Sequence, residues 1–161
     1  MFRILWPHDK DRTMNDLNAL RPLEAYPSRT STDIRYADLD RQGHVNNAVF
    51  ATFSEVGRVA FMYDPARPLA TEGRSFVIAR LQIDFRAELF WPGSVDIGTG
   101  VVRVGRSSFT LAQGIFNEGR LVATTEATIV IVDKETRRST PLPPATVEVL
   151  QSLRLADAPQ E

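Results

Sequence analysis

The chain contains no cysteine. This absence excludes disulfide bonds, thiolate metal ligands and cysteine nucleophiles. Histidine is scarce, with only His8 and His44, so a Ser-His-Asp triad would have to use His44. The sequence has no glycine-rich phosphate loop, no dinucleotide-binding fingerprint, no HExxH zinc motif and no GxSxG elbow.

Long apolar runs are also missing. No stretch approaches the roughly 20 residues that a membrane span needs. The apolar start at residues 1–6 is shorter than a secretory signal and is followed by charged residues. Together with the lack of cysteine, this predicts a cytoplasmic protein. The formal net charge is -1, which indicates neither a nucleic acid nor a membrane as partner.

The length of 161 residues fits one domain, and a hydrophobic content of 43% suffices for one core. Residues 1–27 lack a regular period and are interrupted by three prolines. We expect them to form a flexible N-terminal extension. The domain is predicted over residues 28–153, and residues 154–161 are a C-terminal tail.

One strand and one long helix come first. Residues 30–36 are rich in β-formers and predict a strand. A helix is predicted next, because apolar residues recur at helical spacing and form one stripe. Asn46 or Asn47 is its expected N-cap. This stripe comprises Val49, Phe53, Val56 and Ala60. Asp64-Pro65 ends the helix, since proline disfavours helical geometry in the preceding residue.

Strands fill most of the remaining chain. Residues 77–89 alternate apolar and polar, and Val95, Ile97, Thr99 and Val101 continue the alternation. Further strands and a hairpin at residues 117–119 follow, and a short amphipathic helix comes after residues 141–144. The order predicts an α+β fold with a curved antiparallel sheet of five or six strands around the long helix. One helix cannot cover both sheet faces, so we expect a homodimer or homotetramer.

Chemistry-bearing residues are dense only in the segment Asp38-Leu39-Asp40-Arg41-Gln42-Gly43-His44-Val45-Asn46-Asn47. It leads into the predicted helix, whose first N–H groups are unpaired and carry partial positive charge. A carboxylate beside such donors could attack a carbonyl whose developing oxyanion they stabilise. The alternatives are plain turn and cap chemistry, and a metal site of Asp38, Asp40 and His44, which lacks a clear fourth ligand.

With Phe50, Glu55 and Arg58 downstream, this segment resembles the 4-hydroxybenzoyl-CoA thioesterase-like branch of the hot-dog superfamily, and also plant acyl-ACP thioesterases. The resemblance covers about residues 28–153. It implies a hot-dog fold, a subunit-interface site, and an acyl-CoA thioesterase that needs no metal or cofactor besides the CoA of its substrate. Asp40 is implied as nucleophile or general base, His44 as a further catalytic residue, and Asn47 as the source of the carbonyl-polarising N–H.

The resemblance also suggests substrate-binding positions, all of which could be ordinary solvated or capping residues. These are Gln42, Gly43, Asn46, Glu55, Arg103 and Arg106. Arginine suits the CoA phosphates because its planar fork donates two hydrogen bonds at once. Three alternatives remain open: a non-catalytic acyl-CoA-binding protein, an acyl-ACP thioesterase, and a hot-dog dehydratase, against which the Asp40 turn argues.

Overall fold

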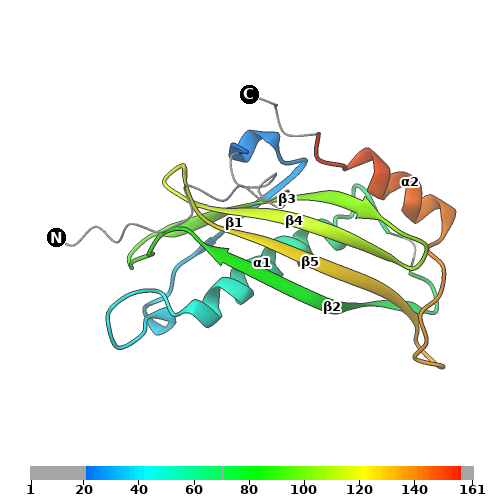
Figure 1. The fold of residues 1–161 in the computed structure, drawn as a ribbon, viewed down its shortest axis with the longest axis horizontal. Helices are drawn as coiled ribbons and strands as arrows, with labels where there is room; N and C mark the ends of the chain where they lie inside the picture. The colour runs from blue at the N-terminus through cyan, green and yellow to red at the C-terminus, as the bar shows by residue number, and fades with distance from the viewer. Residues whose placement is uncertain (1–20, 70, 157–161) are drawn as a thin grey trace, which may run out of the picture.

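The computed structural model describes residues 21–69 and 71–156. Its elements are the strands β1 (Ser28–Asp33), β2 (Arg74–Phe85), β3 (Ser94–Val104), β4 (Ser108–Asn117) and β5 (Arg120–Asp133), the helices α1 (Asn47–Met62) and α2 (Pro144–Ser152), and the short 3-10 helices η2 (Leu23–Ala25) and η3 (Tyr36–Asp38). The strands form one antiparallel sheet in the order β1-β3-β4-β5-β2, and α1 lies across one of its faces (Figure 1). The predicted α+β architecture is confirmed, with five strands.

The centre of the sheet follows the predicted alternation. Val95, Ile97, Thr99 and Val101 of β3 are all at most 1% exposed and face α1 or the adjoining core. The hairpin between β4 and β5 turns at Glu118 and Gly119, which both have positive φ. Such backbone angles match the twist of the flanking strands.

Two predicted boundaries are wrong. The first strand ends at Asp33, and Tyr36–Asp38 form a 3-10 helix because the side chain of Asp38 accepts the backbone N–H of Arg35. The alternating run of residues 77–89 is a strand only as far as Phe85. A β-bulge between Ile78 and Arg80 shifts its phase, so Phe76 packs into the core where Val77 was expected.

The buried face of α1 is rotated from the predicted stripe. Phe53 is buried as expected, but Val49, Val56 and Ala60 are only half-buried. The fully buried positions are Phe50, Phe53, Ser54, Gly57, Arg58 and Phe61. Ser54 and Arg58 belong to an internal polar network with the sheet residue Gln113, which apolar periodicity cannot reveal.

The outer face of the sheet is partly covered by the chain's own ends. In residues 21–27, the described part of the predicted extension, Tyr26 is 1% exposed and packs edge-on against Phe116. After α2, the N–H of Leu155 donates to the carbonyl of Val101 on β3, and the N–H of Val101 donates to the carbonyl of Leu153. The packed domain therefore includes residues 21–27 and reaches Leu155, whereas residues 1–20 and 157–161 of the predicted extension and tail lie outside the described residues.

Candidate active site

The two aspartates of the Asp38–Asn47 segment have different roles. The carboxylate of Asp38 is buried and accepts hydrogen bonds from Arg35, at 2.7 Å from the backbone N and 2.7 Å from Nη2. This side-chain bond from Arg35 holds the pKa of Asp38 below its ordinary value. Asp38 therefore fixes the loop and does not face the site, which removes it from the conceivable metal site.

Asp40 closes a tight turn and keeps one oxygen free. Its Oδ1 accepts the backbone N–H groups of Gln42 (2.7 Å) and His44 (3.2 Å), and its own N–H donates to the carbonyl of His44 (2.8 Å). Gly43 lies at φ 83°, a left-handed conformation that glycine adopts at little cost. No group within residues 21–69 or 71–156 donates to Oδ2 of Asp40, so this oxygen is available to a ligand.

The start of α1 supplies one unpaired donor. Asn46, one of the two predicted candidates, is the N-cap, and its Oδ1 accepts the N–H of Ala48 at 2.9 Å. The N–H of Asn46 is not available, because it donates to the carbonyl of Asp38 at 2.9 Å. The N–H of Asn47 has no hydrogen-bond partner in the described part of the chain. The helix start therefore offers a ligand the N–H of Asn47, with the partial positive charge of the helix N-terminus behind it.

Asp40 and Asn47 line the same pocket, whose volume is about 260 Å³. The polar lining also includes Gln42, His44 and Glu88. The apolar lining consists of Val45, Phe50, Phe85, Ala87 and Leu89. A backbone hydrogen bond from Val45 to Leu89 (2.9 Å) ties the loop to the connection after β2. A lining that combines polar and apolar side chains suits a reactive group joined to an organic chain.

His44 is held between two residues of this connection. Its Nδ1 lies 3.5 Å from Oε1 of Glu88, and its ring meets Phe90 edge-on at 5.0 Å between centroids. Glu88 was not predicted as a site residue, because it was assigned to the polar face of a strand. The only sequence signal for Glu88 was its nearness to Trp91-Pro92-Gly93, which marks the end of the connection.

Several predicted binding residues lie elsewhere in the chain. Glu55 lines a different pocket, two turns or about 12 Å further along α1 from Asn47. Arg103 is exposed near the end of β3, about 30 Å along the strand from Ser94, the end near the site. Arg106 follows in the turn after β3 and is also exposed. Within one chain, these two arginines therefore lie far from Asp40.

In the described residues, no three His, Cys, Asp or Glu side chains gather where they could hold a metal ion. Across the same residues, no helix is long and apolar enough to cross a membrane.

Comparison with known proteins identifies this arrangement. The model of the thioesterase-like superfamily matches residues 34–150. A thioesterase from Thermus thermophilus, solved in complex with coenzyme A and Zn, is 33% identical, with a TM-score of 0.70 over 81% of this chain and 96% of that one. No curated protein matches the sequence.

Two further solved structures show the same fold at lower identity. The PA5185 protein of Pseudomonas aeruginosa strain PAO1 is 22% identical, with a TM-score of 0.75 over 84% of this chain and 97% of that one. A DHNA-CoA thioesterase from Staphylococcus aureus is 24% identical, with a TM-score of 0.71 over 78% and 89%.

The antiparallel sheet curved around α1 is thus a hot-dog fold, as the sequence resemblance implied. The chain belongs to the thioesterase-like superfamily. This membership identifies the chain as an enzyme whose general activity is hydrolysis of a thioester.

Proposed function

We propose that the chain is an acyl-CoA thioesterase in which Asp40 is the reacting carboxylate. One observation carries the proposal: the free Oδ2 of Asp40 and the free N–H of Asn47 line one pocket. A thioester carbonyl whose oxygen accepts the N–H of Asn47 would present its carbon to this carboxylate. CoA is preferred as the carrier because the Thermus thermophilus relative was solved with coenzyme A.

Two routes lead from this geometry to products. In the first, Oδ2 of Asp40 attacks the carbonyl carbon, the C–S bond breaks, and CoA leaves as the thiolate, which takes a proton from solvent. Water then hydrolyses the resulting anhydride and restores Asp40. In the second, Asp40 accepts a proton from a water molecule that attacks the carbonyl directly, and the departing thiolate takes up a proton. In both routes, an N–H donor to the oxyanion is worth roughly 3–4 kcal/mol.

The remaining residues of the pocket have supporting roles in this proposal. His44 orients the substrate or water and is itself oriented by Glu88 and Phe90. Gln42 lines the pocket, and Gly43 shapes the turn. Only groups of the chain and of the substrate take part, so no metal or separate cofactor is required.

The test is release of free thiol from a panel of acyl-CoAs of different length and aromatic character. Asp40→Asn keeps an oxygen that can accept the N–H groups of Gln42 and His44, so the fold is retained while the negative charge is lost. We expect turnover to fall by about 10²–10⁴-fold with substrate binding retained. Asp33→Asn, an exposed aspartate at the end of β1, is the matched control and should keep full activity.

Three outcomes separate the alternatives. Full activity of Asp40→Asn would show that the turn is only a helix cap. Binding of acyl-CoA without thiol release by the wild type would indicate a binding protein. Release from acyl-ACP alone would change the carrier and leave the chemistry in place.

A further inference from the structure

Exposed aromatic side chains gather beside the candidate active site. Among the described residues, three of the six large hydrophobic side chains that are exposed meet here: Tyr36 is 73% exposed, Phe90 54% and Trp91 47%. The rings of Tyr36 and Trp91 meet edge-on, with 5.5 Å between their centroids and 81° between their planes. These three side chains form an aromatic surface. Exposed apolar groups that cluster, rather than scatter singly, commonly mark a binding surface.

The aromatic surface adjoins the pocket that holds Asp40. The ring of Phe90 lies edge-on against the ring of His44, which lines this pocket. Trp91 follows Phe90 in the chain. Tyr36 lies four residues before Asp40, which limits the distance between their Cα atoms to about 14 Å. None of the three rings lines the pocket itself, so they border it from outside.

A substrate joined to a carrier must leave this pocket on a side that is open to solvent. The apolar side chains of the pocket suit the acyl group, which leaves the carrier to extend outward. His44 lies on an open side, because its side chain is 32% exposed, and Phe90 lies against it. A carrier that leaves past His44 therefore meets the aromatic surface.

The far end of CoA matches the side chains found here. CoA ends in an adenine base, which is joined to the pantetheine arm through phosphates. Aromatic side chains bind bases by stacking, because every base has a π-face. Phosphates favour arginine. Arg41 is exposed beside Asp40 and forms no ion pair within the part of the chain that the structure describes.

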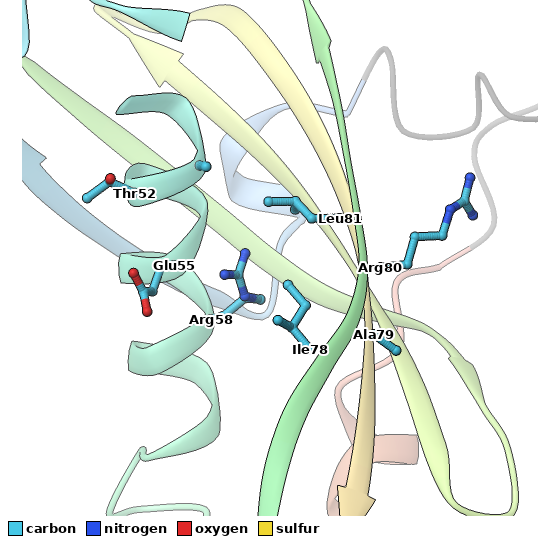
Figure 2. Close-up of a pocket in the computed structure, with 8 residues that line it drawn as sticks. Thr52, Glu55, Arg58, Ile78, Ala79, Arg80 and Leu81 are labelled. Atoms are coloured by element: carbon cyan, nitrogen blue, oxygen red, sulfur yellow. The ribbon is translucent and has the colours of Figure 1, made fainter. Parts of the chain in front are cut away.

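The cavity beside α1 is less suited to the base. It has a volume of about 380 Å³ and lies between α1 and the middle of β2. Figure 2 shows the guanidinium of Arg58 in this space, with Ile78 and Leu81 pointing toward the helix. None of the residues that line the cavity is aromatic. It therefore offers an adenine ring no face on which to stack.

Building on the proposed function, we propose that the adenine base of CoA stacks on the aromatic surface formed by Tyr36, Phe90 and Trp91. The acyl group lies inside the pocket, the pantetheine arm passes His44, and the base rests on the exposed rings. The aromatic surface then selects CoA over carriers that end in the pantetheine arm. It acts on binding of the carrier and takes no part in the reaction at the thioester.

The first test compares two carriers of one acyl group, CoA and pantetheine. Tyr36→Leu and Trp91→Leu keep apolar bulk but remove the ring face, whereas Tyr36→Phe keeps the ring. We expect the ratio of kcat/KM for acyl-CoA to kcat/KM for acyl-pantetheine to fall at least about five-fold in each leucine variant and less in Tyr36→Phe. Tyr63→Leu changes an exposed tyrosine at the C-terminal end of α1 and is the matched control, which should keep the ratio. Because the measure is a ratio, a general loss of activity cancels.

The second test detects the base directly and needs no hydrolysis. Trp6→Phe leaves Trp91 as the only tryptophan of the chain. CoA and ADP, which both contain adenine, should quench the fluorescence of this tryptophan, and pantetheine should not. Adding Tyr36→Leu should raise the CoA concentration needed for half of the quenching at least about five-fold. Quenching by CoA without any thioester hydrolysis would contradict the proposed function and still support binding of the base here.

Four results would overturn the proposal. Equal losses for acyl-CoA and acyl-pantetheine in the leucine variants would show that the rings only support the loop of His44. An unchanged ratio would exclude stacking, and Tyr36→Leu suffices for this if Trp91→Leu does not fold. Quenching by pantetheine but not by ADP would assign the rings to the arm of the carrier. A ratio that falls for Thr52→Leu, which narrows the cavity beside α1, and for neither leucine variant of the rings would place the carrier in that cavity.

Discussion

Gly98→Ala tests whether the N-terminal segment is an integral part of the domain. Gly98 lies on β3 opposite Gly114 of β4, and together they leave a notch in the outer face of the sheet. Tyr26 fills this notch. A Cβ at Gly98 would come within 2.5 Å of Cγ and Cδ2 of the Tyr26 ring and within 2.9 Å of its Cβ. Side chains do not approach so closely, so the ring must shift.

The cost follows from how far Tyr26 moves. Overpacking with local adjustment costs roughly 1–3 kcal/mol, and loss of a large buried aromatic side chain costs about 3–5 kcal/mol. Replacing glycine within a strand returns about 0.5–1 kcal/mol of that. We therefore expect a loss of about 1–4 kcal/mol in the free energy of unfolding. Urea denaturation measures this directly, and Tm should fall by roughly 2–16 °C.

A double-mutant cycle identifies the cause. Tyr26→Gly removes the three atoms nearest to the new Cβ, so Gly98→Ala should be neutral or stabilising in that background. A loss of the same size in both backgrounds would refute the notch explanation. It would place the cost in β3 itself.

Two further predictions concern buried and charged side chains. The Tyr26 hydroxyl has no hydrogen-bond partner among the described residues, and burial raises its pKa from 10.0 to about 12. Because the folded pKa is raised, its stabilising contribution is complete below pH 10 and is lost between pH 10 and 12. Wild type should thus lose up to about 3 kcal/mol more than Tyr26→Phe over this window in urea denaturation, and equal losses would contradict this. In the thiol-release assay, turnover should fall most for Asp40→Asn, less for His44→Ala and least for Glu88→Gln. The reason is that Asp40 acts on the carbonyl, His44 orients the substrate or water, and Glu88 only orients His44. A loss for Glu88→Gln as large as that for Asp40→Asn would make Glu88 a reacting group.

The sequence predicted the parts of the fold that rest on simple periodicity. The alternation along β3 was correct because that strand is central and one of its faces packs under α1. The N-cap was narrowed to Asn46 or Asn47 because an Asn side chain at the local start of the helix suffices to cap it, and the structure identifies Asn46. The candidate site at Asp40, His44 and Asn47 came from a contiguous segment, and the structure places all three at one pocket.

The remaining features depend on contacts between distant segments. The buried face of α1 was misplaced because Arg58 is buried by a polar network from β4 and β5, which has no apolar signal. The bulge in β2 changes which residues face inward, and a strict period of two cannot anticipate it. Glu88 reaches His44 only because the connection after β2 folds back onto the Asp40 loop. Arg103 and Arg106 were placed by resemblance alone, and one chain leaves them far from Asp40.

The outer face of the sheet is closed by both ends of the domain at once. Arg21 donates a hydrogen bond to the carbonyl of Ala156, and Gly100 leaves room for Leu155 and Pro27 side by side. On the ribosome, residues 21–27 emerge before every strand of the sheet, whereas Leu155 is among the last residues of the domain to be made. The newly made chain therefore leaves the part of the outer face that Leu155 covers, around Gly100 and Ala112, exposed until translation of the domain is nearly complete. Exposed apolar surface on an unfinished sheet promotes association with other chains. The interval between synthesis of β5 and of Leu155 is when this protein should depend most on chaperones.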